Sequence, residues 1–343
     1  MADLVVARPE GLYCPPGGFF IDPWRPVERA VITHAHGDHA RAGHGRYLSS
    51  RASTPVMRVR LPGISLTTLE YGETLRHEGV TLSLHPAGHV LGSSQLRIEH
   101  RGEVWVASGD YFAAGERDDP REHNRTCTPL EPVACHCFIT ESTFGLPIYR
   151  WAPQDDVFAA IDAWWRDNAG HGRASVLYAY ALGKAQRVMA GVDRSIGPIV
   201  VHGAVDTVTR AYREAGIALP DTALVTELDD PSLVRRCLVI APPSAQRSPW
   251  LRRFGDMSDA FASGWMQVRG ARRRRSVDRG FVLSDHADWP GLLRVIAATG
   301  ASRVIVTHGF ESAMVRWLGE HGYDAGAFAT EYGDLDDDAP VAT

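Results

Sequence analysis

The sequence lacks the features that would place the chain in a membrane or on a secretory route. No apolar run approaches the roughly 20 residues that a membrane-spanning helix needs. The first residues, MADLVVARPEGLYCPP, contain no basic head followed by an apolar segment, so no signal peptide is expected. Internal repeats and low-complexity stretches are missing as well. We therefore expect a cytoplasmic protein with no membrane partner.

Cysteine is scarce, and its count is odd. Five cysteines in 343 residues do not suggest a disulfide scaffold. Cys135-His136-Cys137 is a possible ligand cluster, but its C-x-C spacing differs from the C-x-x-C pairs of structural zinc sites. The surrounding segment, CHCFIT, is apolar and typical of a buried strand. The pattern favours a structural role for both cysteines.

Lysine is nearly absent, because Lys184 is the only one and arginine supplies the remaining basic charge. The formal net charge of −5 argues against a protein that coats nucleic acid nonspecifically. Arginine forks suit phosphate better than lysine does, so one dense basic run is a candidate nucleic-acid contact, with a solvated charged loop as the alternative. This run comprises Arg269, Arg272, Arg273, Arg274 and Arg275.

The pattern of apolar residues changes near residue 155. At 343 residues and 44% hydrophobic content, the chain is long enough for more than one domain. Before this point, segments such as ERAVITH and VTLSLHPAGH read as short strands. After it, DDVFAAIDAWWRDNAG has helical spacing, ASVLYAYAL reads as a strand, and CLVIAPP and ASGWMQV continue the alternation. Alternating strands and helices predict a parallel sheet covered by helices.

The stretch VITHAHGDHA crowds metal-binding side chains after an apolar run. His34, His36, Asp38 and His39 lie within six residues, and imidazole and carboxylate are ligands of zinc and similar ions. On a loop, His34 and His36 can face one point while Asp38 and His39 face another, so the loop could serve two metals. Further candidate ligands follow other apolar segments: His89, Asp110 and His308.

These motifs resemble a known family. HAHGDH, with Asp22 in FFIDPW, His89 and Asp110, looks like the metallo-β-lactamase fold, an αββα sandwich with metals at one edge. Glu141 in TESTFG, His286 in LSDHAD and His308 in VTHG resemble the three signature positions of the β-CASP nucleases, in which an α/β cassette interrupts that sandwich.

The resemblance implies an α/β fold with two domains. Residues 1–150 and 281–343 would form a discontinuous metallo-β-lactamase domain, and residues 151–280 an inserted β-CASP domain.

The resemblance also implies a role for each residue. His34, His36 and His89 would bind one divalent ion, Asp38, His39 and His308 a second, and Asp110 would bridge them. Asp22 would orient a ligand histidine. His286 would contact the scissile phosphate or protonate the leaving oxygen, and Glu141 would hold His286. The ligand set favours two zinc ions, with manganese as the alternative.

The resemblance leaves the substrate open between DNA and RNA. His308 is typical of RNA-processing branches of the group, whereas DNA cross-link repair members tend to have an aliphatic residue there. However, YALGKAQR and FASGWMQVR resemble a bacterial subgroup of DNA exonucleases that work beside an ATP-dependent DNA ligase and a helicase. We therefore expect a DNA-repair exonuclease, with an RNA-processing endo- or exoribonuclease as the alternative.

Two other classes of function are less favoured. An inactive nucleic-acid-binding scaffold usually lacks metal ligands, and here every ligand position is filled. A small-molecule hydrolase of this fold would not need a second domain such as the one expected over residues 155–280.

Overall fold

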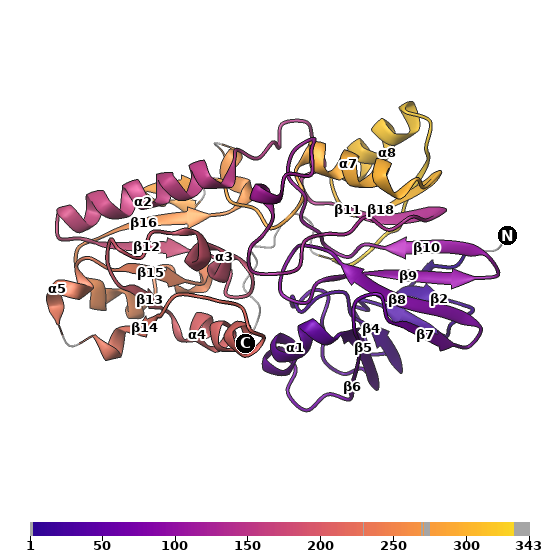
Figure 1. The fold of residues 1–343 in the computed structure, drawn as a ribbon, viewed down its shortest axis with the longest axis horizontal. Helices are drawn as coiled ribbons and strands as arrows, with labels where there is room; N and C mark the ends of the chain where they lie inside the picture. The colour runs from indigo at the N-terminus through magenta and orange to yellow at the C-terminus, as the bar shows by residue number, and fades with distance from the viewer. Residues whose placement is uncertain (1–2, 229, 269, 271–274, 333–343) are drawn as a thin grey trace. The chain divides into compact units, whose positions relative to one another are not determined.

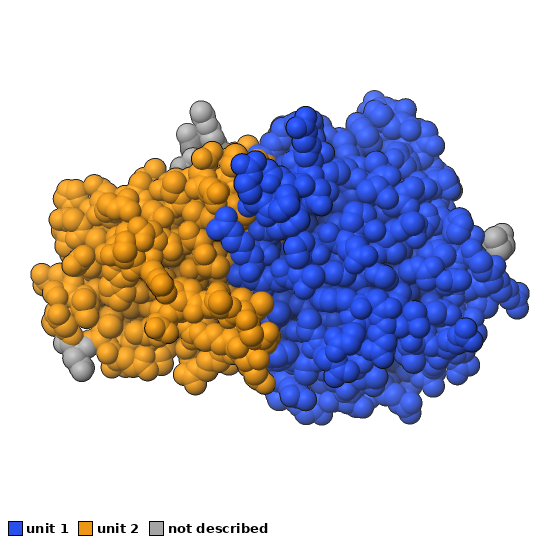
Figure 2. Space-filling model, viewed as in Figure 1, with its two compact units in different colours: residues 1–150, 286–341 blue, residues 151–285, 342–343 orange. Residues whose placement is uncertain are grey.

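The computed structural model describes residues 3–228, 230–268, 270 and 275–332, and they divide into two compact units. The described part of unit 1 comprises residues 3–150 and 286–332, and that of unit 2 comprises residues 151–285 apart from the gaps. Figure 1 shows the fold as a ribbon coloured along the chain, and Figure 2 shows the two units in different colours. From the sequence we expected the inserted segment to span 151–280.

The part of unit 1 that the structure describes forms two sheets. The first has six strands in chain order, with antiparallel pairing from β1 to β3 and parallel pairing from β3 to β6. These strands are β1 (Val6–Arg8), β2 (Gly11–Cys14), β3 (Phe19–Ile21), β4 (Arg29–Val31), β5 (Arg46–Ser50) and β6 (Leu66–Leu69).

The second sheet has seven strands in the order β19-β18-β11-β10-β9-β8-β7. Strands β7 to β10 pair antiparallel, whereas β10, β11, β18 and β19 pair parallel. Their bounds are β7 (Thr74–His77), β8 (Val80–Pro86), β9 (Ser94–His100), β10 (Glu103–Ala107), β11 (Cys137–Ser142), β18 (Arg303–Gly309) and β19 (Asp324–Ala327). Because β10, β11 and β18 are parallel neighbours, their carboxyl ends lie at the same edge of the sheet.

One apolar cluster joins the two sheets of unit 1. It combines Ile21 and Val31 of the first sheet with Leu84, Leu96 and Ile139 of the second. A second cluster lies on the other face of the seven-stranded sheet, where alternate residues of its strands contact helices. The two clusters explain why the first half of β11, Cys137 to Ile139, and the centre of β18 are apolar at successive positions, since both faces are covered.

The described residues of unit 1 form three α-helices: α1 (Thr54–Arg60), α7 (Trp289–Thr299) and α8 (Glu311–Glu320). Helix α7 follows clear local rules. Asp288 caps its start by accepting from Gly291 N, Pro290 lies in its first turn, and Gly300 ends it with φ of 66°. Its buried residues, such as Leu292 and Val295, belong to the cluster on the outer face of the sheet.

Unit 2 contains a six-stranded, all-parallel sheet in the order β14-β13-β15-β12-β16-β17. Its strands are β12 (Ala174–Tyr178), β13 (Ile199–Val201), β14 (Ala223–Leu224), β15 (Leu238–Ala241), β16 (Met257–Ala262) and β17 (Arg279–Phe281). The described helices are α2 (Gln154–Gly170), α3 (Lys184–Gly191), α4 (Gly203–Glu214) and α5 (Pro231–Val234).

Helix α2 shows the periodicity that the sequence predicts. Its apolar residues recur on one face and pack into an apolar cluster shared with the strands of this sheet. They are Val157, Phe158, Ile161, Trp164 and Trp165. The predicted mixed α/β class is confirmed, while the αββα order of layers stays a prediction. Among residues 3–228, 230–268, 270 and 275–332, no helix combines the length and the apolar character that crossing a bilayer would require.

The segment ASGWMQV departs from the expected alternation of strands and α-helices. Strand β16 ends at Ala262, and Gly264–Gln267 forms a 3₁₀ turn whose start is capped by the Ser263 side chain. The polar residues of MSDAFA interrupt the apolar pattern of β16, so the sequence did not indicate this strand. Ser258 is buried there because its hydroxyl accepts from Trp164 Nε1 and donates to Asp278.

The only lysine is buried in unit 2. Lys184 Nζ lies 3.2 Å from Asp285, and Arg187 Nη1 lies 3.2 Å from the other oxygen of the same carboxylate. Arg187 also donates to the Ser284 carbonyl. A buried charge needs such partners to offset its desolvation. The lysine therefore anchors the end of the inserted segment rather than serving as a surface charge.

Candidate metal centre

The loop after β4 begins the site. Ile32 N donates to Leu48 O and continues the sheet, after which Ala40 N bonds back to His36 O at 2.7 Å. This tight turn presents His34 and His39 inward, with both side chains buried, while Asp38 is partly exposed. The spacing of the motif therefore produces convergence of its side chains rather than a row of separate surface groups.

The other candidate ligands come from strand ends of the second sheet. His89 lies in the turn after β8, where Ser93 Oγ accepts from its backbone N–H. Asp110 follows β10, and His308 lies near the end of β18. The parallel pairing of β10, β11 and β18 brings Asp110, Glu141 and His308 to one edge, although they lie far apart in the sequence.

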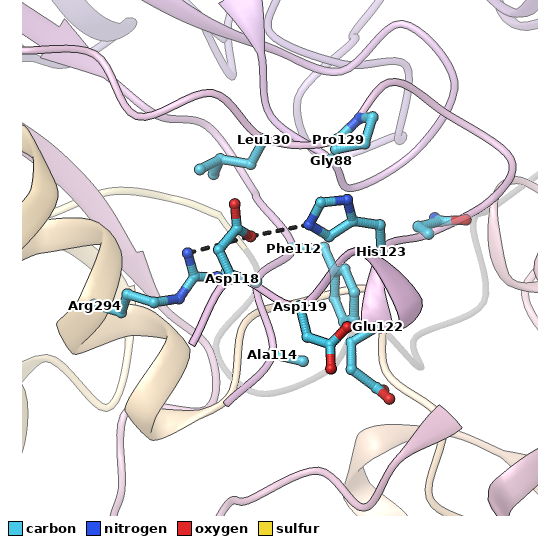
Figure 3. A pocket seen from close by; sticks show the side chains of 12 residues that line it. Gly88, Phe112, Ala114, Asp118, Asp119, Glu122, His123, Pro129, Leu130 and Arg294 are labelled. Carbon is cyan, nitrogen blue, oxygen red and sulfur yellow. Dashed lines mark hydrogen bonds and ion pairs between the residues drawn. The ribbon is translucent and has the colours of Figure 1, made fainter. Parts of the chain in front are cut away.

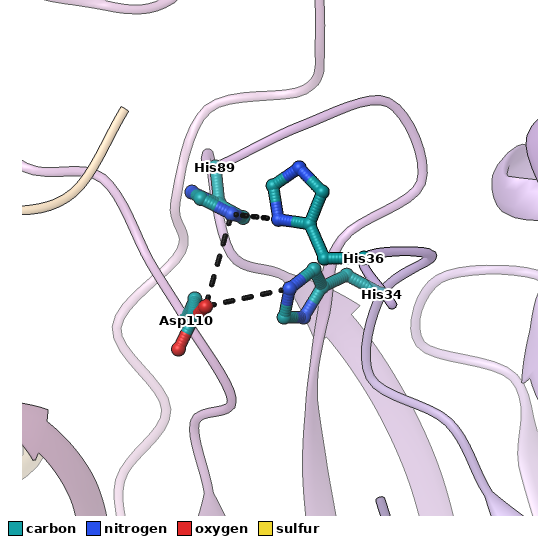
Figure 4. A group of neighbouring side chains, drawn as sticks. All are labelled: His34, His36, His89 and Asp110. Atoms are coloured by element: carbon teal, nitrogen blue, oxygen red, sulfur yellow. Dashed lines mark hydrogen bonds and ion pairs between the residues drawn. The ribbon is translucent and has the colours of Figure 1, made fainter. Parts of the chain in front are cut away.

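A first group of ligand atoms comes from His34, His36, His89 and Asp110, and these atoms lie within 4.8 Å of one another (Figure 4). His89 Nε2 lies 3.1 Å from His36 Nδ1, and His34 Nε2 lies 3.4 Å from Asp110 Oδ2. Three imidazole nitrogens and a carboxylate oxygen converging on one point form a donor set typical of zinc.

A second group shares Asp110 with the first. It consists of His39, Asp110 and His308. His39 Nε2 lies 3.5 Å from Asp110 Oδ2, and His308 Nε2 lies 3.1 Å from Asp110 Oδ1. Asp38 lies next to this group, with its Oδ2 atom 3.5 Å from His39 Nε2. Asp110 therefore belongs to both groups, as a bridging ligand must.

Two buried nitrogen atoms support the presence of a cation. His34 Nε2 and His39 Nε2 have no hydrogen-bond partner in the described structure, although both are shielded from solvent. A buried polar atom without a partner is costly, and a metal ion in each ligand group would satisfy these nitrogens. The residues present therefore fit a divalent metal.

The electrostatics of the centre agree with this fit. Burial favours neutral His39, but the carboxylates of Asp110, Asp38 and Asp22 outweigh it and raise its pKa to about 10. Burial also opposes ionisation of Asp110, yet His39 and His34 hold the pKa of that carboxyl well below its usual value. The carboxylates therefore stabilise positive charge at His39, whereas burial and the neighbouring His39 lower the pKa of His34 well below its usual value.

Asp22 organises the histidines from behind. Its Oδ1 accepts from Thr33 N at 2.7 Å, and its Oδ2 accepts from Thr33 Oγ1 at 2.5 Å and lies 2.8 Å from His39 Nδ1. Thr33 Oγ1 in turn lies 3.1 Å from His34 Nδ1. Asp22 has a φ of 41°, a conformation that Asp and Asn tolerate better than most residues. The Nδ1 atoms of His34 and His39 therefore contact residues outside the centre, and this orientation directs their Nε2 atoms into it.

Glu141 and His286 form a pair at the edge of the centre. His286 Nδ1 lies 2.9 and 3.1 Å from the two oxygens of Glu141, and Tyr111 N donates to Glu141 Oε1 at 2.8 Å. The rings of His286 and His89 are 4.6 Å apart. The pair therefore lies beside the first ligand group, with His286 Nε2 as the ring nitrogen not used by Glu141.

The remaining sequence candidates are the arginine run and the segment from Cys135 to Cys137. Arg269 and Arg272, Arg273 and Arg274 lie outside the described residues. Arg275 belongs to unit 2, where its guanidinium lies over the Phe261 ring at 4.7 Å. Around β11, Cys135 and Cys137 are buried whereas His136 is exposed and accepts from Val104 N, so these three side chains do not converge.

Sequence reasoning missed Thr33, Thr307 and Tyr332. Thr307 Oγ1 lies 3.0 Å from His308 Nδ1, which repeats the relation of Thr33 to His34. The repeated dipeptide Thr-His was a usable signal in VITHAH and IVTHG. Tyr332 stacks on His39, and no local pattern marks it.

A small pocket borders the loop that carries His89 (Figure 3). Asp118 lies between two nitrogen-bearing partners there, at 2.9 Å from His123 Nε2 and 3.4 Å from Arg294 Nη1. The cavity volume is about 10 Å³, which is near the minimum for a single water molecule. The pocket is therefore too small to hold a nucleotide.

Comparisons with known proteins give relatives but no family model that matches the chain. A "Probable DNA ligase" from Opitutus terrae is 34% identical over 94% of the chain, which is 31% of that protein. Endoribonuclease YSH1 of Saccharomyces cerevisiae is 29% identical over 37% of the chain and 15% of its own length. Ribonuclease TTHA0252 of Thermus thermophilus is 28% identical over 37% of the chain and 34% of its own length. The chain thus spans about a third or less of these relatives.

Among solved structures, a protein of unknown function from Enterococcus faecalis resembles the chain with a TM-score of 0.59 and 12% identity. The similarity covers 89% of this chain and 80% of that one. At this level of identity the likeness shows a shared fold alone.

Proposed function

We propose that the protein is a metal-dependent nuclease of the metallo-β-lactamase and β-CASP type, acting as a DNA exonuclease in repair alongside an ATP-dependent DNA ligase. The observation that carries this proposal is the position of Asp110. One of its oxygens faces His34 and His39, and the other faces His308. The similarity to two ribonucleases supports the hydrolysis of nucleic acid.

The donor set fits two divalent ions. Imidazole and carboxylate accept zinc readily and manganese also. Paired ions would lower the pKa of water towards neutrality and stabilise the charge that develops on phosphate oxygens. With the carboxylates of Asp38 and Asp110 as the only anionic ligands, a pair of divalent ions would leave a net positive centre. Such a centre attracts a phosphodiester anion.

His286 and Glu141 would supply the proton for the leaving oxygen. Glu141 accepts from His286 Nδ1, which stabilises the protonated imidazole and fixes the orientation of the ring. The proton to be given away then resides on Nε2. Cleavage of the phosphodiester leaves a sugar oxygen that needs this proton, and general acid catalysis typically contributes about 10²–10⁴-fold.

The preference for DNA rests on the extent of one similarity. Almost the whole chain aligns with part of a protein named as a DNA ligase, whereas the ribonucleases align with 37% of it. A nuclease that trims ends before sealing is a natural companion of a ligase. The alternative is an RNA-processing nuclease, which the printed names of the ribonucleases favour.

The decisive test uses matched DNA and RNA strands of one sequence, labelled at either end and incubated with protein reconstituted with zinc or manganese. The proposal expects metal-dependent release of nucleotides from a DNA end. The His286→Ala variant, which keeps all metal ligands, is the control against contaminating nucleases. Cleavage of RNA alone would establish the alternative, and no metal-dependent cleavage of either strand would refute both.

A further inference from the structure

The chain returns to the metal centre after β19 through the segment Thr330–Tyr332. Phe328 N donates to Val306 O at 2.9 Å, so the chain first follows β18. Thr330 Oγ1 then donates to the carbonyl of Thr307, the residue before His308. Glu331 pairs with Arg25 at 2.7 Å, although this contact is exposed. These contacts lead the segment from the β18 end towards residues 21–25.

The Tyr332 ring lies against both histidines of the second ligand group. It stacks on His39 with the ring centroids 4.5 Å apart and the planes 11° apart. It also makes a T-shaped contact with the His308 ring, with the centroids 5.6 Å apart and the planes at 74°. Trp24 packs edge-on against it at 5.5 Å, and Tyr332 is only 5% exposed. One aromatic ring thus contacts two ligands that come from opposite ends of the sequence.

The hydroxyl of Tyr332 bonds to the segment that orients His39. It donates to the backbone carbonyl of Asp22 at 3.1 Å. The side chain of Asp22 contacts His39 Nδ1 at 2.8 Å. His39 is therefore held at its nitrogen by Asp22 and over its face by Tyr332, and the two holding residues are bonded to each other.

We infer that Tyr332 is a positioning residue for the ion held by His39, Asp110 and His308. This inference rests on the proposed metal centre, and it assigns no metal-binding or reactive role to Tyr332 itself. A planar ring is suited to the task, because it blocks rotation of His39 out of the Asp22 bond and fills the space beside His308. His34 and His36 of the first group have no ring contact with Tyr332 among the described residues.

The effect on each ion can be measured separately in two single-site backgrounds. His36→Ala removes a ligand of the first group only, and His308→Ala removes a ligand of the second group only. Tyr332→Leu is added to each background, and zinc affinity is measured by competition with a chelator. We expect about 10–100-fold weaker binding in the His36→Ala background, because residues behind metal ligands typically contribute that much. Binding in the His308→Ala background should stay unchanged.

Two further variants control for general disruption. Tyr332→Phe keeps the stacked ring and loses one hydrogen bond, so its defect should be less than about tenfold. Tyr323→Leu changes another tyrosine of unit 1, which packs against the cluster beneath α7 and α8, and should leave both affinities unchanged. Should Tyr332→Leu fail to fold by circular dichroism, Tyr332→Met, which also lacks a ring but is longer, decides in its place.

The outcomes separate this inference from the proposed function. Equal affinity with and without Tyr332→Leu in the His36→Ala background would overturn the inference and leave the nuclease proposal intact. An equal loss in both backgrounds would overturn it too, since that result indicates general disruption. Wild-type protein that binds two ions without cleaving nucleic acid would refute the nuclease proposal alone. Wild-type protein that binds no zinc would refute both.

Discussion

Replacing Asp22 by Asn tests whether this carboxylate sets the tautomers of the ligand histidines. Asp22 Oδ2 faces two donors, Thr33 Oγ1 at 2.5 Å and His39 Nδ1 at 2.8 Å. The Asn amide can keep the bond from Thr33 N to Oδ1, but it places an NH₂ group where Oδ2 was. A donor then faces a donor at His39, so Nδ1 must lose its proton and Nε2 must carry it. A protonated Nε2 cannot bind a metal.

The same change reaches His34 through Thr33. In the native arrangement the Thr33 hydroxyl donates to Asp22 and can accept from His34 Nδ1, which lies 3.1 Å away. Beside an Asn amide the hydroxyl would accept instead and donate to His34 Nδ1, which moves the proton of His34 to Nε2 as well. One substitution therefore disfavours the metal-binding tautomer of one ligand in each group.

The expected magnitude follows from the number of bonds affected. A buried donor or acceptor left unsatisfied costs about 1–3 kcal/mol, and loss of a residue behind a metal ligand typically weakens binding about 10–100-fold. We therefore expect Asp22→Asn to weaken the binding of both ions by about 10–100-fold. The backbone should tolerate Asn, because Asp22 has a φ of 41° and Asn accepts this conformation. Ala would add about 1–2 kcal/mol of strain there, so Asn is the cleaner probe.

Chelator competition with zinc, in wild type and in the variant, measures the two affinities. Asp324→Asn is the matched control, since the Asp324 side chain is 78% exposed and belongs to the same unit. Thermal unfolding of the metal-free proteins checks that the fold survives. Both ions bound by Asp22→Asn as tightly as by wild type would refute the tautomer argument.

Three other predictions concern the reaction, the nucleic acid and the thiols. His286→Ala should retain both ions but lose about 10²–10⁴-fold in the rate of cleavage, and Glu141→Gln should show a milder defect; loss of a metal from His286→Ala, or a wild-type rate, would contradict the assigned roles. Replacing Arg269 and Arg272 to Arg275 together should weaken nucleic-acid binding at all sequences and flatten its salt dependence, as titrations at several salt concentrations would show. Burial raises the pKa of Cys14 and Cys135 to about 11 and that of Cys137 and Cys237 to about 12, so iodoacetamide at pH 8 should modify Cys127 well before these four, as mass spectrometry would reveal.

The first half of the candidate site could be predicted because its information is local. His34, His36, Asp38 and His39 lie in one turn, and the apolar strand before them fixes where that turn occurs. The remaining ligands carry weaker signals, since a single histidine or aspartate after a strand is common. Their place in the site was predicted from the family resemblance. The physical reason for it is the parallel order of β10, β11 and β18, which no local pattern reveals.

The fold could be predicted to a similar depth. The helical spacing of apolar residues predicted helix α2, and continuous apolar runs predicted strands β12 and β15. Strand β16 was not predicted, because Ser258 and Asp259 interrupt the apolar run. In the structure, the Ser258 hydroxyl and the Asp259 backbone N–H donate hydrogen bonds to Asp278. Hydrogen bonds between side chains that are distant in sequence make a polar segment acceptable in a sheet. Such bonds have no periodicity, so pattern analysis cannot anticipate them.

Tyr332 illustrates why positioning residues are harder to find than ligands. A ligand must offer an imidazole or a carboxylate, so side-chain chemistry alone narrows the candidates along the sequence. A residue that packs behind a ligand needs only shape and one donor, and ten tyrosines satisfy that description equally well. What distinguishes Tyr332 is its contact with His39 and His308, which are separated by most of the chain. Because the second ligand group draws on both ends of the sequence, its stability depends on a contact that brings these ends together, and Tyr332 makes that contact.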